Sequence, residues 1–239
     1  MVKTLMYPVL RNGTTAPRVR LVVEVAGLAG AGKTTLALAL RQCDEHFMVG
    51  VPLPRTGYLP FVVSIMRFFL PVFLRQYRDS RWFTREEIRS MIYLKAWYHL
   101  VSRQRSAEGT VAILDHGPIY RLAWLHEFGP EIVRSGRFAQ WSAEVLDQWA
   151  ASLDLVIWLD APDAVLVERI AARDRWHVVK GKSEQETYQF LARYRASYDW
   201  VLSRLTANGG PKVLRFDTNQ ESLDQILKNV LQCIGPGVL

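Results

Sequence analysis

The sequence reads Gly27-Leu28-Ala29-Gly30-Ala31-Gly32-Lys33-Thr34 and continues with Thr35. The glycines let the backbone curl so that several N–H groups can point inward at an anion. A helix that begins directly after such a loop adds the positive end of its dipole. Lys33 would then contact the β- and γ-phosphates of a nucleotide, and the Thr34 hydroxyl would bind Mg²⁺. We therefore expect residues 27–35 to hold ATP together with Mg²⁺.

The segments around this loop have the lengths and patterns of alternating strands and helices. Residues 21–26 form an apolar run that leads straight into the loop, and residues 33–43 have helical periodicity. Further strands are expected at residues 47–51, 111–114, 155–159 and 213–216. Such alternation is typical of a parallel sheet covered on both faces. We predict a three-layer α/β fold with five parallel strands, in which ligands bind at the carboxyl ends of the strands.

Other segments have the periodicity of helices, and these are residues 59–77, 84–105 and 223–234. Thr84 and Glu87 form the pattern of a capping box, which marks the start of the second of them. The stretch 61–74 is rich in Phe, Val, Leu and Ile, but Arg67 and Pro71 interrupt it and it is too short to cross a bilayer. We favour a buried helix here and keep an interfacial or partner-binding helix as the second interpretation.

The composition is that of an ordinary soluble chain. It has 239 residues, 49% of them hydrophobic and 22% charged, which favours one domain over residues 1–239 with an N-terminal extension at 1–20. The net charge of +7 suits anionic partners, but it gives no reason to expect a specific nucleic acid. Cys43 and Cys233 lack metal-ligand spacing, and the first residues lack the apolar core of a secretory signal. A cytoplasmic protein without a transmembrane segment is expected.

Magnesium needs a carboxylate near Thr34, and two of the apolar strands end in an aspartate. Asp115 is followed by His116-Gly117-Pro118, which breaks regular structure and exposes side chains at the edge of the sheet. Asp160 precedes Ala161-Pro162 and a helix, a pattern that suits an N-cap. We therefore assign the metal to Asp115 with Thr34, in preference to Asp160.

Arginines gather after the fourth predicted strand, in the run Arg169-Ile170-Ala171-Ala172-Arg173-Asp174-Arg175. The run continues a helical segment, so a spacing of four puts Arg169 and Arg173 on one face. A solvated basic surface would give the same pattern. In phosphoryl transfer, however, cations on a closing element stabilise the charge on the transferred group, and arginine suits that role. The position of the run after this strand favours such an element.

Together these features resemble the thymidylate kinase and deoxynucleoside kinase superfamily over about residues 21–233. Gly-Ala-Gly-Lys-Thr-Thr at residues 30–35 is similar to thymidylate kinases. Arg-Ile-x-x-Arg-x-Arg at residues 169–175 is similar to the lids of deoxynucleoside kinases. Members of this superfamily have five parallel strands, a phosphate loop and an arginine-bearing lid after the fourth strand, so the resemblance implies the same fold here.

The resemblance also assigns residues to the donor side of the site. It implies a lid at about residues 175–184, and it implies that Arg173 and Arg175 contact phosphates as catalytic residues beside Lys33 and Asp115. It places Arg169 with Arg173 at the bound ATP. The segment Asp217-Thr218-Asn219 would lie near the adenine.

The acceptor side departs from this family. Its members usually carry Asp-Arg or Glu-Arg where this chain has Asp115-His116, and deoxynucleoside kinases place a base carboxylate where this chain has Leu53 before Pro54. Arg55 stands where thymidylate kinases have an arginine for the substrate phosphate. Either the acceptor is already a phosphate and needs no strong base, or Asp115 or His116 takes the proton. We place Arg55, His116, Tyr120 and Arg121 in the acceptor site.

These expectations converge on an ATP-dependent phosphotransferase that acts on a small molecule, a nucleoside or a nucleoside monophosphate. Two alternatives stay open: a kinase for a non-nucleotide metabolite, and a nucleotide-dependent switch or accessory ATPase that acts on a partner or a membrane. The latter rests on the 61–74 stretch and on Arg75, Arg78 and Arg81 beside it. A GTPase is disfavoured because the sequence has no Asn-Lys-x-Asp motif. A homodimer is also left open.

Overall fold

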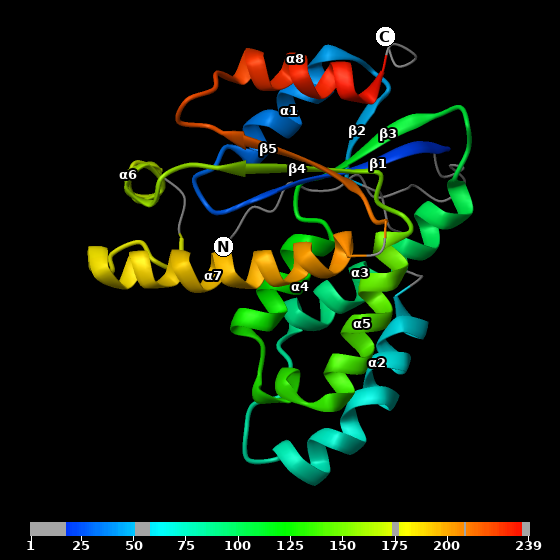
Figure 1. Ribbon diagram of the computed structural model, residues 1–239. Coiled ribbons are helices and arrows are strands. Elements are labelled where there is room, and N and C mark those ends of the chain that lie inside the picture. Colours follow the sequence, from blue (N-terminus) through cyan, green and yellow to red (C-terminus); the bar gives the residue numbers. More distant parts are fainter. Residues whose placement is uncertain (1–17, 51–57, 174–176, 208, 236–239) are drawn as a thin grey trace.

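Short apolar segments of the chain pair into one sheet; the computed structural model describes residues 18–50, 58–173, 177–207 and 209–235. The strands are β1 (Val19–Gly27), β2 (Phe47–Val49), β3 (Thr110–Leu114), β4 (Leu155–Asp160) and β5 (Lys212–Asp217). They lie in the order β2-β3-β1-β4-β5, and every neighbouring pair is parallel (Figure 1). The predicted sheet of five parallel strands is confirmed.

Helices cover both faces of this sheet (Figure 1). On one face lie α1 (Lys33–Cys43) and α8 (Leu223–Ile234). On the other lie α4 (Pro118–Phe128) and α7 (Glu184–Thr206), with α3 (Arg85–Gln104) beside them. Farther from the sheet are α2 (Leu59–Val72), the short turn Glu131–Arg134 and α5 (Gly136–Ala150), while α6 (Asp163–Ala171) follows β4. The three-layer α/β architecture expected from the sequence is confirmed.

The central strands are buried on both faces, and this explains why they read as unbroken apolar runs. The fully buried side chains include those of Val22, Val23, Ile113, Val156 and Ile157. β1 lies between β3 and β4, and its last residue, Gly27, pairs with Leu159 of β4. The loops that follow β1, β3 and β4 therefore meet at one edge of the sheet, where parallel sheets bind ligands.

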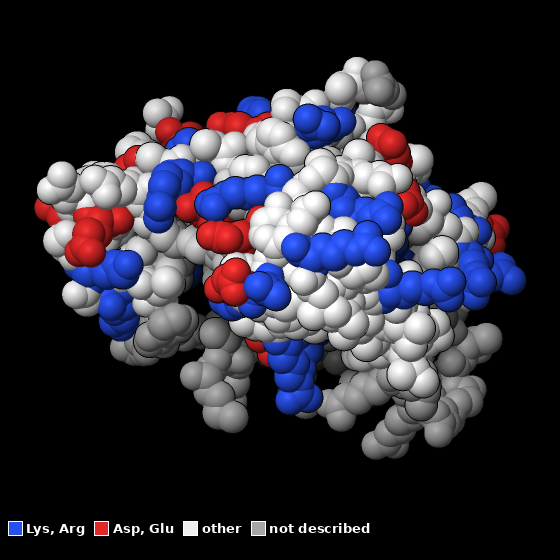
Figure 2. Space-filling view, turned by 90° about the horizontal axis from the view of Figure 1, so that it is seen from below, with Lys and Arg blue, Asp and Glu red and all other residues white. Residues whose placement is uncertain are grey.

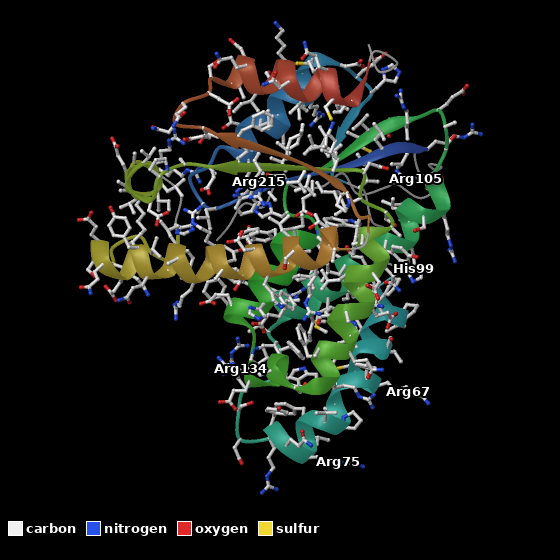
Figure 3. All side chains as sticks on the ribbon, viewed as in Figure 1. Arg67, Arg75, His99, Arg105, Arg134 and Arg215 are labelled. Atoms are coloured by element: carbon white, nitrogen blue, oxygen red, sulfur yellow. The ribbon has the colours of Figure 1, made fainter. Side chains whose placement is uncertain are left out.

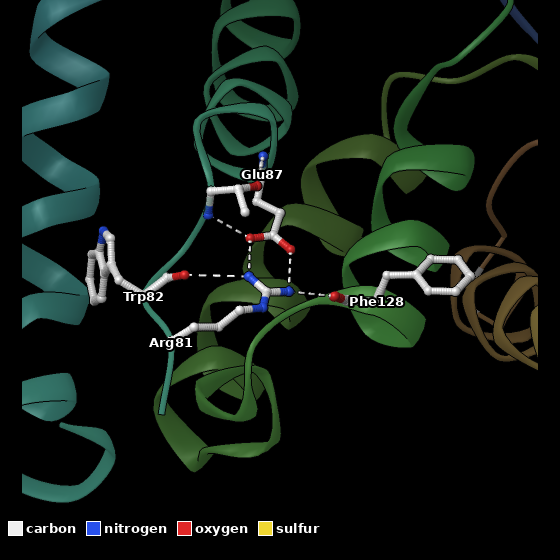
Figure 4. A network of polar contacts seen from close by, with 5 residues as sticks. Arg81, Trp82, Glu87 and Phe128 are labelled. Carbon is white, nitrogen blue, oxygen red and sulfur yellow. Dashed lines mark hydrogen bonds and ion pairs between the residues drawn. The ribbon is translucent and has the colours of Figure 1, made fainter. Parts of the chain in front are cut away.

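The start of α3 is fixed by the capping box that the sequence predicts and by an arginine from the preceding loop (Figure 4). The Thr84 hydroxyl accepts from the Glu87 N–H at 3.3 Å, and the Glu87 carboxylate accepts from the Thr84 N–H at 2.7 Å. Arg81 donates one hydrogen bond of 2.8 Å to each oxygen of Glu87 and one of 2.7 Å to the Phe128 carbonyl. Because Phe128 ends α4, Arg81 ties the start of α3 to the end of α4.

The position of α2 corrects the interpretation of the 61–74 stretch as a buried helix. Only Ile65 and Phe69 of α2 are buried, whereas Leu59 and Val63 are 69% and 55% exposed. The helix packs along one side on α3 and α5, and its other side lies at the edge of the molecule (Figure 1). Hydrophobic composition predicts that a helix needs a partner, but it does not tell how much of its surface finds one within the same chain.

A π-helical turn, Phe73–Tyr77, continues α2 after Pro71, whose ring nitrogen has no hydrogen to donate. Leu74 in this turn is 58% exposed. Among the described residues, Leu59–Tyr77 is the one helical segment long and apolar enough to cross a membrane, judged by length and composition alone.

Candidate functional site

The phosphate loop leaves the end of β1 and curls before α1 begins at Lys33. Gly27, Gly30 and Gly32 have φ angles of 143°, 93° and 89°, values that residues with side chains rarely adopt. Gly27 also has no room for a side chain, because a Cβ there would lie 2.1 Å from the carbonyl oxygen of Leu159. The glycine spacing noted in the sequence is therefore what the curl of the backbone requires.

The Lys33 side chain folds back over this loop. Its Nζ donates a 2.8 Å hydrogen bond to the carbonyl oxygen of Leu28. Burial lowers the pKa of Lys33 to about 8; the Asp115 carboxylate opposes this shift, and the Arg173 guanidinium adds to it. Lys33, Asp115 and Arg173 therefore lie close enough together for each charge to influence the next.

The first residues of α1 meet the end of β3 through Thr34 and Asp115. Thr34 Oγ1 donates a 2.9 Å hydrogen bond to Asp115 Oδ2. The Asp115 side chain is 1% exposed, and its Oδ1 atom has no hydrogen-bond partner among the described residues. Burial raises the pKa of Asp115, while Lys33 and the Thr34 hydroxyl lower it. A buried carboxylate oxygen without a donor is costly, so this position calls for a ligand.

The donor set at this position fits Mg²⁺. A hydroxyl and a carboxylate are hard oxygen ligands, and Mg²⁺ in such sites takes its remaining ligands from water and substrate phosphates. The orphaned Oδ1 of Asp115 and the Oγ1 of Thr34 would hold the ion beside Lys33. Bound there, the ion would neutralise charge on the phosphates.

Behind Asp115 lies a buried carboxyl group that the sequence analysis missed. Glu24 of β1 has no exposed surface, and its two oxygens accept hydrogen bonds of 2.9 and 3.0 Å from the N–H groups of Ile119 and Tyr120. Burial raises its pKa to about 8 against the effect of these two bonds and of Arg121. Glu24 thus fixes the first turn of α4. The available signal was a single acid within the apolar run at residues 21–26.

His116 and Tyr120 stand next to Asp115 at the start of α4. The His116 ring meets the Tyr120 ring edge to face, with the ring centres 4.3 Å apart, and its Nδ1 lies 3.8 Å from Asp115 Oδ2. Burial lowers the pKa of His116 to about 3, and the charges of Lys33 and Arg121 lower it further. His116 is therefore neutral near pH 7, so it can accept a hydrogen bond but holds a proton poorly.

Arg121 is buried against two aromatic rings of α3. Its guanidinium carbon lies 4.5 Å from the ring centre of Tyr93 and 4.9 Å from that of Trp97, and its Nη1 donates to the Ser90 hydroxyl at 3.2 Å. The two rings stack on each other, 4.9 Å apart. The sequence singled out Arg121, but it gave no sign of the aromatic pair, because Tyr93 and Trp97 reach it only through the packing of α3 on α4.

Arg169 of α6 connects the phosphate loop with the loop that follows β5. It donates hydrogen bonds of 2.8 and 3.0 Å to the hydroxyl and carbonyl oxygens of Thr218, and Nη1 lies 3.5 Å from the Gly30 carbonyl. Thr218 in turn bonds to the carbonyl oxygen of Asp160. The segment at residues 217–219, expected near the adenine, is thus joined directly to α6.

Arg173 lies beyond the end of α6, which ends at Ala171, whereas the sequence predicted that the helix continues to Arg173. It does not share a helix face with Arg169 for that reason. Its charge reaches both Lys33 and His177, whose pKa is lowered by burial and then by Arg173 and Lys33. Arg175 and Arg55 lie outside the described residues, so an arginine-rich lid and the predicted contact of Arg55 with the acceptor stay predictions.

Asp160 does not serve as the helix cap that the sequence suggested. Pro162 occupies the N-cap position of α6, while the carboxylate of Asp160 accepts from the Ala161 N–H at 2.9 Å and pairs with Arg195 of α7. Arg195 also pairs with Asp163. The charge of Asp160 is therefore compensated by an arginine 35 residues away in the sequence, which leaves Asp115 as the strand-end aspartate beside the phosphate loop.

Comparisons with known proteins identify the fold. The sequence matches no protein-family model, and no curated protein matches it. Thymidylate kinase from Candida albicans is similar in structure, with 16% identity and a TM-score of 0.52, over 92% of this chain and 92% of that chain.

Deoxyadenosine kinase from M. mycoides with bound dCTP is similar at 15% identity and a TM-score of 0.50, over 90% of this chain and 98% of that one. The same enzyme with bound dATP matches at 14% identity and a TM-score of 0.50, over 90% and 99% of the two chains. The chain therefore has the fold of P-loop kinases over nearly all of its length.

Proposed function

We propose that this protein is an ATP-dependent phosphotransferase that moves the γ-phosphoryl group to a nucleoside or a nucleoside monophosphate. The observation that carries the proposal is the hydrogen bond between Thr34 and Asp115 beside Lys33. The N–H groups of the curled loop and the Lys33 ammonium would bind the phosphates, and Thr34 and Asp115 would hold Mg²⁺. Arg173 would add positive charge near Lys33.

The acceptor would bind at the start of α4, which brings His116 and Tyr120 to Asp115. Arg121 of the same helix is buried against the rings of Tyr93 and Trp97, so it supports this region from inside the protein. Neutral His116 would orient an acceptor hydroxyl by accepting its hydrogen bond. A weak base suffices, because the loose transition state of phosphoryl transfer depends on positioning and charge more than on proton removal.

The test is transfer of label from γ-labelled ATP to a panel of nucleosides and nucleoside monophosphates, followed by a second panel of sugars and other alcohols. We expect product with at least one member of the first panel. Lys33→Ala should lower its formation by about a thousandfold, because it removes one charge contact to the transferred group. Arg173→Ala should have an effect of the same order, and an unchanged rate in Arg173→Ala would reject its catalytic role.

The other outcomes separate the alternatives. Transfer only to the second panel would keep the phosphotransferase and overturn the nucleotide acceptor. ATP hydrolysis without transfer to any acceptor would favour the nucleotide-dependent switch. Failure to bind ATP in the presence of Mg²⁺ would overturn the proposed function altogether.

A further inference from the structure

A surface on α2 and the π-helical turn after it has no role in the proposed catalytic site. We call it the outer face and define it by Leu59, Val63, Arg67, Leu74, Arg75 and Arg78, all of them exposed. Its three apolar side chains are 69%, 55% and 58% exposed, and the other large apolar side chains described as exposed, Leu38 and Leu223, reach only 38%. Exposed apolar surface concentrated on one element marks an interaction site.

The packing of α2 keeps this face turned outward. On its opposite side, the Phe69 ring lies 5.6 Å from that of Phe83, 6.0 Å from that of Phe138 and 5.9 Å from that of Trp141. These contacts attach α2 to α5 and to the loop before α3. The four-residue spacing of Leu59, Val63 and Arg67 then points away from the body of the protein. Rotation of α2 to bury the outer face would expose Phe69, so only an external partner could cover the face.

All the charged residues that define the outer face are arginines. The sequence has no Asp or Glu from residue 46 to residue 78. Arg67 and Arg75 project outward from this side of the molecule (Figure 3), and Arg78 forms an ion pair of 3.9 Å with the exposed Asp79. The view from below shows basic side chains set among uncharged surface, with acidic side chains from other segments on the same side (Figure 2). A partner must therefore offer both apolar material and negative charge.

We propose that the outer face binds the surface of an anionic lipid membrane, with α2 lying in the plane of the headgroups. The leucine and valine side chains would insert between the headgroups and the acyl chains. The arginines would form bidentate hydrogen bonds with lipid phosphates. A second copy of the chain suits the face less well. A two-fold contact centred on Arg67 would bring two guanidinium groups together, and no acid from residues 46–78 would lie between them.

Sedimentation of the full chain with vesicles tests this proposal. We expect binding to vesicles of phosphatidylcholine mixed with phosphatidylserine and none to phosphatidylcholine alone. The double variant Val63→Glu/Leu74→Glu should lose the binding. Arg67→Gln/Arg75→Gln should weaken it by about 25-fold, because each arginine near an anionic surface contributes about fivefold. Added salt should weaken binding by the unchanged protein as well.

The matched control is Leu38→Glu/Leu223→Glu, which adds the same two charges on α1 and α8, on the other face of the sheet (Figure 1). It should keep the binding, and thermal unfolding checks that both double variants are folded. Equal loss in the control would mean that net charge alone drives binding, and equal binding to both vesicle types would remove the role of the arginines. Either result overturns the proposal.

Light scattering after size-exclusion chromatography tests whether a second copy of the chain covers the outer face instead of a membrane. A dimer that Val63→Glu/Leu74→Glu separates into monomers, in a protein that does not sediment with anionic vesicles, would assign the face to a second copy and overturn the membrane. Neither vesicle binding nor the oligomeric state depends on phosphoryl transfer, so these experiments test the membrane proposal independently of the proposed function.

Discussion

Thr34 Oγ1 lies 2.9 Å from Asp115 Oδ2, although 81 residues separate the two in sequence. The contact exists because β1 and β3 are parallel neighbours, which brings the helix that follows β1 beside the residue that follows β3. The contact brings together the two side chains that would hold Mg²⁺. Asp160 ends the neighbouring strand on the other side of β1, yet its carboxylate faces Arg195.

Exchange of each aspartate for asparagine should therefore have different effects. In the unchanged protein and in Asp160→Asn, we expect Mg²⁺ to raise the affinity for ATP, because the ion bridges the phosphates to Asp115. In Asp115→Asn this gain should fall by about 10- to 100-fold, since the anionic ligand is lost. Calorimetric titration with ATP, once in the presence of Mg²⁺ and once in the presence of EDTA, measures this gain in affinity, and it needs no acceptor. The same loss in both variants would contradict the assignment.

The lowered pKa of Lys33 predicts a pH dependence of nucleotide binding. In the free protein, burial and then Arg173 hold this pKa at about 8 against the pull of Asp115, and bound phosphates would raise it again. ATP binding above pH 8 must therefore be accompanied by uptake of a proton. We expect the affinity to fall with rising pH, by at most about tenfold per unit, until the pKa of the complex is reached.

Calorimetry in buffers of different ionisation enthalpy measures that proton uptake. Lys33→Arg keeps a positive charge at all these pH values and should bind ATP without it. A pH-independent affinity in the unchanged protein would show that Lys33 keeps its proton in the free state.

Gly117 lies against the buried carboxyl group of Glu24, and its replacement should destabilise the fold. A Cβ at this position would be 2.6 Å from Glu24 Cδ and 2.9 Å from Leu114 Cβ, so the start of α4 would have to move. We expect Gly117→Ala to lower the free energy of unfolding by about 1–3 kcal/mol, measured in urea. Gly136→Ala is the matched control, because nothing lies within 4 Å of a Cβ there. Equal stability of the two variants would mean that α4 shifts without cost.

The parts of this structure that the sequence predicts are those set by local pattern. The loop at residues 27–34, the apolar central strands and the capping box of Thr84 each depend on residues close together in the chain. The features that were missed depend on packing between distant segments. Glu24 finds its donors on α4, and Asp160 finds Arg195 on α7. Neither partner leaves a mark in the sequence near the residue itself.

The same limit explains the two errors about helices. An apolar stretch such as residues 61–74 predicts that a helix forms, but the exposure of α2 depends on how far α3 and α5 extend along it. The end of α6 at Ala171 separates Arg169 from Arg173, so the two do not share a helix face. Arg169 joins α6 to the loop after β5 through its bonds to Thr218, and its contact with bound ATP stays a prediction.

The ion pair between Arg81 and Glu87 should stabilise the fold and make that stability depend on pH. Burial favours the neutral form of Glu87, but the hydrogen bonds from Arg81 and Thr84 outweigh it and lower its pKa below 4.5. The stabilisation is thus present above pH 4.5 and is lost as the pH falls through the lowered value. Arg81→Gln should cost about 2 kcal/mol at neutral pH, because it leaves the buried carboxylate with fewer donors.

Arg89 provides the control for this prediction, because it lies near the same end of α3 and pairs with Glu86 at 3.0 Å. Both partners of that pair are exposed, so Arg89→Gln should change the free energy of unfolding by about 0.5 kcal/mol or less. Urea unfolding at neutral pH and again below the lowered pKa of Glu87 compares the two. The difference between Arg81→Gln and the unchanged protein should shrink in acid, where Glu87 is protonated in both. A difference that stays constant with pH would assign the effect of Arg81 to its bond with the Phe128 carbonyl instead.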